Sequence, residues 1–305
     1  MKKVLLLYNP KSGNRQVIQH LDGITKRIQE MGYTLCIYRS EAKNAIENYI
    51  LENVSNGCFD LLLISGGDGT INECINGMAK KGLEIPLGIL PLGTANDFAH
   101  SLGIPLHLKG ALEVIEKETP KLVDIGLVND KYFINVCSMG LFTGVSHAID
   151  LELKKKFGKL AYYVKGLEEL QNYHPMDLII ETDQEMIKGK YLLVLIFNGK
   201  GAGGFMKLAK YAEIDDGMFD AICIKNIAIH EIPMLFLKIL QGEHLEDSKI
   251  DYIKSRKIKI ECTNQEKGFV TDIDGEEAPA FPLNINNISK RIKIYRPEKK
   301  LNKEN

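Results

Sequence analysis

The sequence lacks the features that mark several classes of protein. Its six cysteines lie at least 16 residues apart, so there is no C-x-x-C pair and neither a zinc knuckle nor a disulfide framework is indicated. The 39 basic and 40 acidic residues leave a formal net charge of −1, which argues against a dedicated nucleic-acid-binding protein. The longest apolar run, from Tyr191 to Phe197, is far shorter than the ~20 residues of a membrane-spanning helix. We therefore expect a soluble cytoplasmic protein that can still touch a membrane transiently.

The order of the predicted elements divides the chain into two parts. In the first third, strands alternate with helical patterns, which predicts βαβ units and a parallel sheet with both faces covered. From Lys121 onward, strands follow one another with few helices, so this part should be mostly antiparallel β. The length of 305 residues allows two cores, because single cores stop growing at about 250 to 300 residues. The predicted strands are 3–8, 33–39, 60–65, 122–128, 132–136, 178–182, 186–197, 219–224, 253–262, 269–274 and 291–295, and the main predicted helices are 15–31, 44–55, 70–80, 151–170 and 231–240.

One glycine-rich segment, SGGDGT at 65–70, lies directly between an apolar strand and an amphipathic helix. Glycines at such a turn let the backbone approach a ligand closely, and the helix N-terminus offers unpaired N–H groups to a phosphate. Asp68 is unfavourable beside a phosphate unless a metal ion lies between them, so the motif suggests a nucleotide with Mg²⁺. The alternative is a tight turn in which Asp68 only caps a helix.

Several further motifs accompany this segment. GGDGT is preceded by NPKSG at 9–13 and followed by PLGTANDFA at 91–99, and the chain later contains DDGMFD at 215–220 and DGE at 274–276. In their order and spacing these motifs resemble the diacylglycerol kinase catalytic domain, in the form found in soluble bacterial lipid kinases. The resemblance spans nearly the whole chain, whereas GGDGT alone also occurs in NAD kinases and, more loosely, in phosphofructokinases.

The resemblance implies ATP-dependent transfer of a γ-phosphoryl group to a lipid hydroxyl, with diacylglycerol as the leading acceptor and phosphatidic acid as the product. It implies an α/β fold in which an N-terminal three-layer nucleotide-binding domain (1–125, completed by 288–305) is followed by a mostly antiparallel β-rich sandwich domain for the lipid (126–287), with the active-site cleft between them. The cofactors would be ATP and Mg²⁺. The residues that match the family's nucleotide site are Asn9, Pro10, Lys11, Ser12, Gly13, Ser40, Gly66, Gly67, Asp68, Gly69, Thr70, Ile71, Asn72 and Thr94.

Four carboxylates resemble the family's catalytic groups. Asp68, Asp97 and Asp124 match the acidic network that organises the catalytic Mg²⁺, and Glu276 matches the general base that accepts the lipid hydroxyl proton. Phosphoryl transfer needs these functions, because it depends on positioning, charge neutralisation and a proton acceptor. The simpler alternatives are that Asp97 caps a short helix at Phe98, that Asp124 is a polar residue at a strand edge and that Glu276 is a solvated turn residue.

A second metal site is implied by the resemblance in the segment 213–218. There the Asp216 carboxylate and the carbonyl groups of Glu213 and Met218 would bind a structural Mg²⁺. The sequence departs from the family at Asp215, where relatives often have Asn. The alternative is an ordinary Asp-Gly hairpin turn before the strand at 219–224.

The predicted helix at 151–170 bears a cluster of lysines opposite an apolar face. They suggest peripheral contact with an anionic membrane, where each lysine contributes ~1 kcal/mol, or else a merely solvated face. The apolar helix at 231–240 suits a core position or part of an acyl-chain channel. We expect no nucleic-acid partner and leave a homodimer open. The lysines of the cluster are Lys154, Lys155, Lys156, Lys159 and Lys165.

Other functions remain as alternatives. The acceptor could be another lipid alcohol, such as phosphatidylglycerol or a sphingoid base, because the sequence does not show which apolar residues line an acceptor pocket. An NAD kinase shares GGDGT but not the accompanying NPKSG, PLGTANDFA and DGE motifs. A nucleotide-binding regulator without turnover is a third alternative, although such a protein could lose Asp68 or Glu276, and both are present here. The segment GKGAGG at 199–204 fits G-x-G-x-x-G, but no convincing helix follows it, so a dinucleotide site is not indicated.

Overall fold

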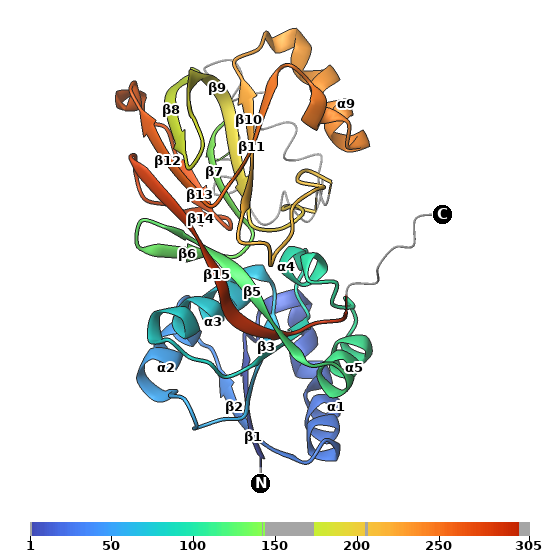
Figure 1. Cartoon of the computed structure of the whole chain (residues 1–305). Helices are drawn as coiled ribbons and strands as arrows, with labels where there is room; N and C mark the ends of the chain where they lie inside the picture. The colour runs from blue at the N-terminus through green and yellow to red at the C-terminus, as the bar shows by residue number, and fades with distance from the viewer. Residues whose placement is uncertain (1, 142, 144–173, 205–206, 299–305) are drawn as a thin grey trace. The chain divides into compact units, whose positions relative to one another are not determined.

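The computed structural model describes residues 2–141, 143, 174–204 and 207–298, which form two compact units. Unit 1 comprises Met1–Ile125 with Ser289–Asn305, and unit 2 comprises Gly126–Ile288. Strands β5 (Pro120–Val128) and β15 (Leu283–Tyr295) each begin in one unit and end in the other (Figure 1). The C-terminal segment therefore returns to the first unit.

Unit 1 is built on a parallel sheet in the order β15-β4-β3-β1-β2. Every residue of β3 is buried, as is the apolar run of β1 from Val4 to Tyr8. Continuous apolar strands of this kind are typical of a parallel sheet that is covered on both faces. The strands are β1 (Lys2–Tyr8), β2 (Tyr33–Arg39), β3 (Leu61–Gly66) and β4 (Leu87–Pro91), and the main helices are α1 (Gln16–Glu30), α2 (Ala45–Asn53), α3 (Asp68–Lys81) and α5 (Leu108–Lys117).

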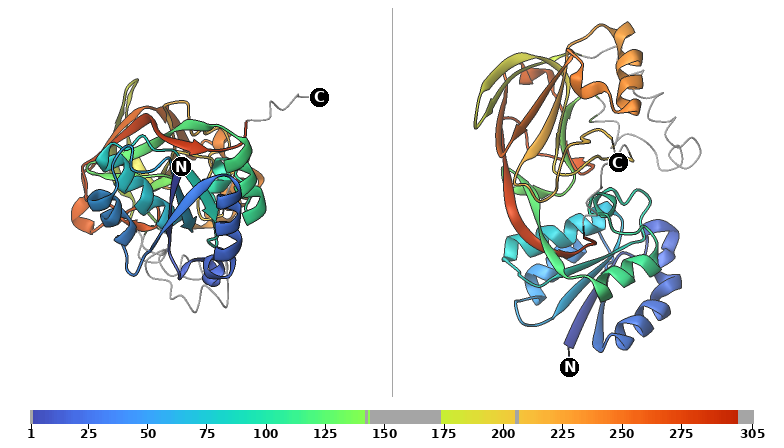
Figure 2. Two further views of the ribbon diagram at one scale, coloured as in Figure 1. Left: turned by 90° about the horizontal axis from the view of Figure 1, so that it is seen from below. Right: turned by 45° about the vertical axis from the view of Figure 1, so that its right-hand side comes forward.

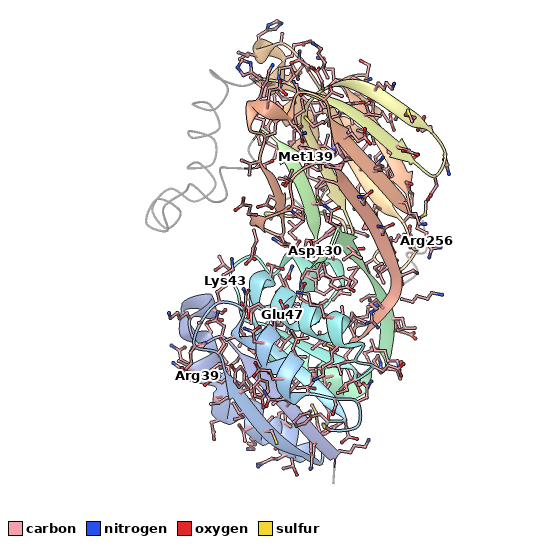
Figure 3. The ribbon with its side chains drawn as sticks, turned by 90° about the vertical axis from the view of Figure 1, so that its left-hand side faces the viewer. Arg39, Lys43, Glu47, Asp130, Met139 and Arg256 are labelled. Carbon is pink, nitrogen blue, oxygen red and sulfur yellow. The ribbon has the colours of Figure 1, made fainter. Side chains whose placement is uncertain are left out.

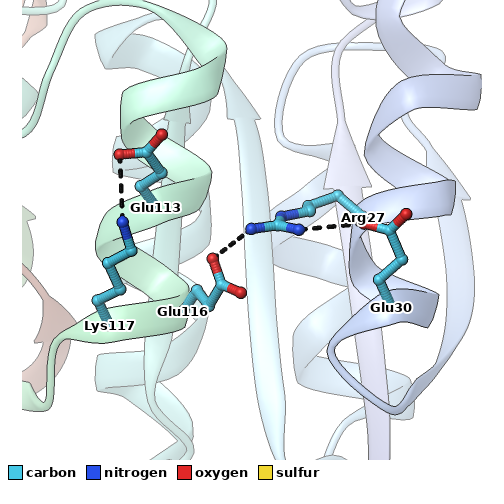
Figure 4. Close-up of polar contacts among 5 residues, drawn as sticks. All are labelled: Arg27, Glu30, Glu113, Glu116 and Lys117. Atoms are coloured by element: carbon cyan, nitrogen blue, oxygen red, sulfur yellow. Dashed lines mark hydrogen bonds and ion pairs between the residues drawn. The ribbon is translucent and has the colours of Figure 1, made fainter.

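The helices of unit 1 cover the two faces of this sheet in pairs (Figure 2). On one face, Arg27 of α1 forms ion pairs with Glu30 of its own helix and with Glu116 of α5, so α1 and α5 lie side by side (Figure 4). On the other face, Lys80 of α3 pairs with Glu47 of α2, with 2.6 Å between nitrogen and oxygen. The predicted three-layer α/β architecture is confirmed.

Unit 2 is an antiparallel β structure. Its strand β9 is twelve residues long and pairs with β8, β7 and β10, so the sheet branches there. Apolar residues alternate along β8 and β12, and Met176, Leu178, Ile258 and Ile260 enter one large core. The strands are β6 (Lys131–Phe133), β7 (Val136–Gly140), β8 (Met176–Thr182), β9 (Met186–Phe197), β10 (Phe219–Lys225), β11 (Ile250–Ser255), β12 (Lys257–Cys262), β13 (Thr271–Ile273) and β14 (Glu276–Glu277).

Two predicted strands are each interrupted. The strand predicted at 253–262 is two strands, β11 and β12, separated at Arg256 (Figure 3). They pair with different partners, β11 with β10 and β12 with β8 and β15, so the chain changes neighbours between them. The strand predicted at 132–136 is likewise wrong as a single element, because the amides of 134–136 bind the Asp274 carboxylate instead of continuing a ladder.

The two helices predicted in the second half have different outcomes. The helix predicted at 231–240 is α9 (Ile232–Gln241), and Leu235 is its only buried residue. One face of this helix packs against a hydrophobic core through Leu235, Ile232 and Ile239, whereas Met234 and Leu237 on its other side are 60% and 51% exposed. The lysine-rich helix predicted at 151–170 lies outside the described residues. In the described part of the chain, no helix is long and apolar enough to cross a membrane.

Candidate functional site

Three sequence motifs meet where the strands of unit 1 end. The GGDGT segment runs from the end of β3 into the first turn of α3, with Gly67 as the N-cap residue. A Cβ atom added to Gly93 would lie 2.2 Å from the Cα atom of Gly67, and one added to Gly66 would lie 2.6 Å from the Cβ atom of Thr70. Gly93 is thus required by close packing between the PLGTANDFA and GGDGT loops, and Gly66 by close packing within the GGDGT loop.

The NPKSG motif joins the same cluster of loops. Gly13 has a φ of +51°, and a Cβ atom there would lie 1.7 Å from the carbonyl oxygen of Leu92. The hydroxyl oxygens of Ser12 and Thr70 are 3.3 Å apart, and the amide of Asn9 donates to the carbonyl of Ser65 at 3.4 Å. Because parallel strands bind ligands beyond their carboxyl ends, this edge is the candidate nucleotide site.

The remaining residues matched to the nucleotide site lie in different environments. Ser40 follows β2, and its amide donates to the carbonyl of Tyr8 at 2.9 Å, so it lies at the same sheet edge. Thr94 is exposed, whereas Ile71 is fully buried in the core, so a nucleotide could contact only the backbone of Ile71. Asn72 accepts hydrogen bonds from the Asn76 amide along α3. Pro10 is buried, and Lys11 is exposed.

Asp68 connects two helices. It is the first residue of α3, and its Oδ1 accepts a 2.9 Å hydrogen bond from the amide of Phe98 in α4 (Asp97–Ser101). The side-chain acceptor at the start of α4 is therefore Asp68, and no side-chain capping bond comes from the N-cap residue Asn96. A carboxylate near two helix N-termini is favoured by both dipoles. The sequence did not reveal this contact, because it links residues 30 positions apart.

The other two predicted catalytic aspartates of unit 1 are buried. Asp97 is 7% exposed, and Asp124 of β5 is fully buried. The Oδ1 atom of Asp124 accepts a 2.7 Å hydrogen bond from the amide of Lys290, a residue of β15 with a φ of 53°. Asp124 thus ties β5 to β15 inside unit 1, where it is shielded from solvent.

The donor atoms of unit 1 suit Mg²⁺ only as a partly hydrated ion. Magnesium prefers hard oxygen ligands and usually keeps several waters while binding one or two carboxylates and substrate phosphates. Asp68 is partly exposed at the phosphate loop and supplies such an oxygen. Within the described residues, no group of three or more His, Cys, Asp or Glu side chains could hold a metal by itself. The site therefore fits an ion that arrives with a nucleotide.

Glu276 lies in unit 2 on a two-residue hairpin. It is the first residue of β14, it pairs with Ile273 of β13, and it is exposed. Asp274 and Gly275 form the turn between these strands, with φ values of 53° and 88°. Asp-Gly is strongly preferred where both turn residues need a positive φ. The geometry thus places Glu276 immediately after a tight turn.

The predicted structural metal site is occupied by protein donors. Lys254 of β11 places its Nζ 2.8 Å from Oδ2 of Asp216, and the amide of Met218 donates to Oδ1 at 3.0 Å. The carbonyl of Met218 accepts a 3.3 Å hydrogen bond from Asn287. In this arrangement the Asp216 carboxylate forms an ion pair with the Lys254 ammonium. The roles of Glu213, Asp216 and Met218 as metal ligands stay predictions.

One buried acid beside this segment carried no role in the sequence analysis. Asp220 of β10 is fully buried, and it accepts a hydrogen bond from the hydroxyl of Tyr252. Burial raises the pKa of the Asp220 carboxyl above its ordinary value, while the Tyr252 hydroxyl and the charge of Lys254 oppose that change. In the sequence, only the position of Asp220 in the DDGMFD motif marked this residue. That position did not show whether Asp220 is buried or lies at the surface.

Two family models match the chain. The first describes the diacylglycerol kinase catalytic domain and matches residues 3–128. The second describes the YegS C-terminal NAD kinase beta sandwich-like domain and matches residues 135–296. The sandwich predicted for the second half agrees with this description.

Similar proteins cover almost the whole length. A diacylglycerol kinase of Bacillus subtilis (strain 168) is 35% identical over 306 residues, which cover 98% of each chain. A diacylglycerol kinase of Staphylococcus aureus (strain bovine RF122 / ET3-1) is 34% identical over 303 residues, which cover 99% of this chain and 95% of the relative. A solved structure from Bacillus anthracis str. Sterne, assigned to the diacylglycerol kinases, has a TM-score of 0.81 and 31% identity over 97% of this chain and 96% of that one.

The fold and the glycine-rich loops, together with these likenesses, define the class of the protein as a lipid kinase. More narrowly, the chain belongs to the diacylglycerol kinase family. The resemblance inferred from the motifs is thereby confirmed. The prediction of a lipid kinase, rather than a non-catalytic relative, is supported by the same comparisons.

Proposed function

We propose that this chain transfers the γ-phosphoryl group of ATP to the hydroxyl of diacylglycerol and so forms phosphatidic acid. The observation that carries the proposal is the convergence of NPKSG, GGDGT and PLGTANDFA at one edge of the parallel sheet, through the contacts of Gly13 with Leu92 and of Gly67 with Gly93. The relatives that match over their full length are named diacylglycerol kinases, which supports this acceptor over other lipid alcohols and over NAD.

In the proposed reaction, unit 1 binds the nucleotide and unit 2 supplies the base. The backbone N–H groups at the start of α3 hold the phosphates, and Asp68 holds the charge that orients the metal ion. When bound, Mg²⁺ neutralises charge that develops on the phosphate oxygens. The oxygen of the lipid hydroxyl bonds to the γ-phosphorus while Glu276 accepts the proton of that hydroxyl. The bond from the γ-phosphorus to the bridging oxygen of ADP breaks.

The acceptor is tested by direct competition. The purified chain would be incubated with labelled ATP, Mg²⁺ and mixed micelles that contain diacylglycerol, phosphatidylglycerol or sphingosine, with NAD in a parallel tube. We expect label in phosphatidic acid. Label in another lipid product would keep the lipid kinase class and replace the acceptor, and label in NADP alone would overturn the proposal.

A further inference from the structure

The turn that carries Glu276 is anchored by two carboxylates: Asp272 accepts the Gly275 amide at 2.9 Å, and Asp274 binds a neighbouring segment of unit 2. Asp274 and Gly275 are the only residues between β13 and β14, so a shift of Asp274 moves Glu276 directly. The Oδ2 atom of Asp274 accepts the amide of Ile134 at 2.6 Å, and its Oδ1 accepts the amides of Asn135 at 2.9 Å and Val136 at 3.0 Å. Three donors on one carboxylate form a strong, charge-assisted set of hydrogen bonds.

Asn198 binds carbonyl groups of the same segment, residues 134–136. The carbonyl of Ile134 accepts the Asn198 side-chain amide at 3.1 Å, and the carbonyl of Asn135 accepts the Asn198 backbone amide at 2.9 Å. The carbonyl of Val136 accepts the backbone amide of Asp274 at 3.0 Å. All three N–H groups and all three carbonyls of 134–136 are thus satisfied by Asp274 and Asn198, as buried backbone requires.

This arrangement joins two loops. Asn198 follows the last residue of β9, is 1% exposed, and directly precedes the glycine-rich loop at 199–204. Asp274 begins the turn that ends at Glu276. The segment 134–136 therefore connects the turn of Glu276 to the start of the glycine-rich loop through hydrogen bonds.

We propose that Asp274 is a positioning residue for Glu276, and that Asn198 supports it through 134–136. The proposal rests on the proposed function of Glu276 as the general base. Displacement of a reacting group by about 1 Å can lower a rate by ~10². Loss of the Asp274 carboxylate should therefore reduce catalysis through Glu276 and leave ATP binding in unit 1 intact.

The test is a double-mutant cycle on the full chain. Asp274→Asn keeps a residue that tolerates a positive φ but replaces one acceptor oxygen by a donor that faces the N–H groups of 134–136. We expect kcat to fall by ~10² while KM for ATP changes by less than about twofold. The double variant with Glu276→Gln should be no slower than Glu276→Gln alone, within about threefold, because both changes act on one group. Asp130→Asn, in the exposed turn between β5 and β6 (Figure 3), is the matched control and should keep the parental kcat.

Each outcome of the cycle has one meaning. If Glu276→Gln is slow but Asp274→Asn keeps kcat within about threefold of the parent, the positioning role is overturned and the base assignment stands. If the two losses multiply in the double variant, Asp274 acts independently of Glu276 and the proposal fails. If Glu276→Gln keeps the parental kcat, the base assignment itself fails.

A second variant covers the case in which Asp274→Asn does not fold. Asn198→Ala removes the side-chain bond to Ile134 and keeps the backbone bond to Asn135. We expect a smaller loss of kcat, about threefold to tenfold, that again disappears on the Glu276→Gln background. A variant that melts at a lower temperature yet turns over at the parental rate would reduce this cluster to a structural role.

Discussion

Asp68 combines two tasks at the residue scale. Its Oδ1 holds the start of α4 through the Phe98 amide, and in the proposed reaction its charge orients the metal ion that comes with the nucleotide. The first task needs only an acceptor oxygen, whereas the second needs a negative charge. A substitution that keeps the oxygen and removes the charge can therefore separate them.

Asp68→Asn should preserve the melting temperature within about 2 °C, because the amide oxygen can still accept from Phe98. Turnover should fall at least about a hundredfold, since the charge that orients the metal ion is lost. Steady-state kinetics at several Mg²⁺ concentrations and a thermal melt would measure both. Near-parental activity with an unchanged Mg²⁺ requirement would refute the catalytic role, and Asp68→Ala should lose stability as well.

Glu276→Gln keeps the shape of the side chain and removes the base. General-base effects are typically ~10² to 10⁴-fold, so kcat should drop at least about a hundredfold. ATP affinity, measured by calorimetry, should stay the same because the phosphate loop belongs to unit 1. A variant that retains more than about a tenth of the parental kcat would move the base elsewhere, with Asp97 or Asp124 as the next candidates.

At the scale of elements, the nucleotide edge depends on backbone contact between loops. A side chain at Gly93 would collide with the backbone of Gly67, and one at Gly13 would collide with the carbonyl of Leu92. Helix α3 begins within this contact, so the orientation of its N-terminal N–H groups depends on it.

Gly93→Ala should destabilise the chain by about 1 to 3 kcal/mol, because the added methyl would lie 2.2 Å from Gly67 and 2.9 Å from the Gly67 amide nitrogen. ATP affinity should fall with it, since the loops must separate. Denaturant unfolding and ATP titration would measure the two effects. Gly23→Ala in α1 is the control: its added methyl meets nothing within 4 Å, and the change should stabilise the helix by roughly 0.5 to 1 kcal/mol. Equal behaviour of the two variants would show that the loop contact is not tight.

At the scale of the whole molecule, a lipid kinase must meet its acceptor at a membrane surface. The sequence argument for that contact rests on the lysine cluster at 151–170, which lies outside the described residues. Clustered lysines attract an anionic surface, and salt screens this attraction over about 8 Å at physiological ionic strength.

Replacement of Lys154, Lys155, Lys156 and Lys159 by Gln should weaken binding to phosphatidylglycerol vesicles by at least tenfold, since ~1 kcal/mol per lysine is lost. Turnover of a short-chain substrate free in solution should not change. Vesicle sedimentation at several salt concentrations would measure the effect, and the parent's binding should weaken as salt rises. Salt-independent binding, or equal binding by the variant, would reduce this segment to a solvated face.

Much of the fold and of the candidate site could be predicted from local sequence. The strand at 186–197 and the start of α9 follow from runs of apolar residues, and GGDGT lies at the predicted strand-to-helix turn. The breaks at Arg256 and at 134–136 could not be predicted in this way. Strand-forming residues flank both positions, and what ends each strand is a change of partner or a distant carboxylate.

The sequence by itself determined the class of the protein, because the motifs NPKSG, GGDGT, PLGTANDFA, DDGMFD and DGE occur in the order and spacing of one family. Only the tertiary structure decided what the charged groups touch. Asp274 binds an amide 139 residues away, Asp124 binds one 166 residues away, and Lys254 of β11 forms an ion pair with Asp216. Periodicity reports on the residues within one strand or helix, whereas these contacts depend on how strands distant in sequence pair, and that pairing forms only when the apolar faces pack together.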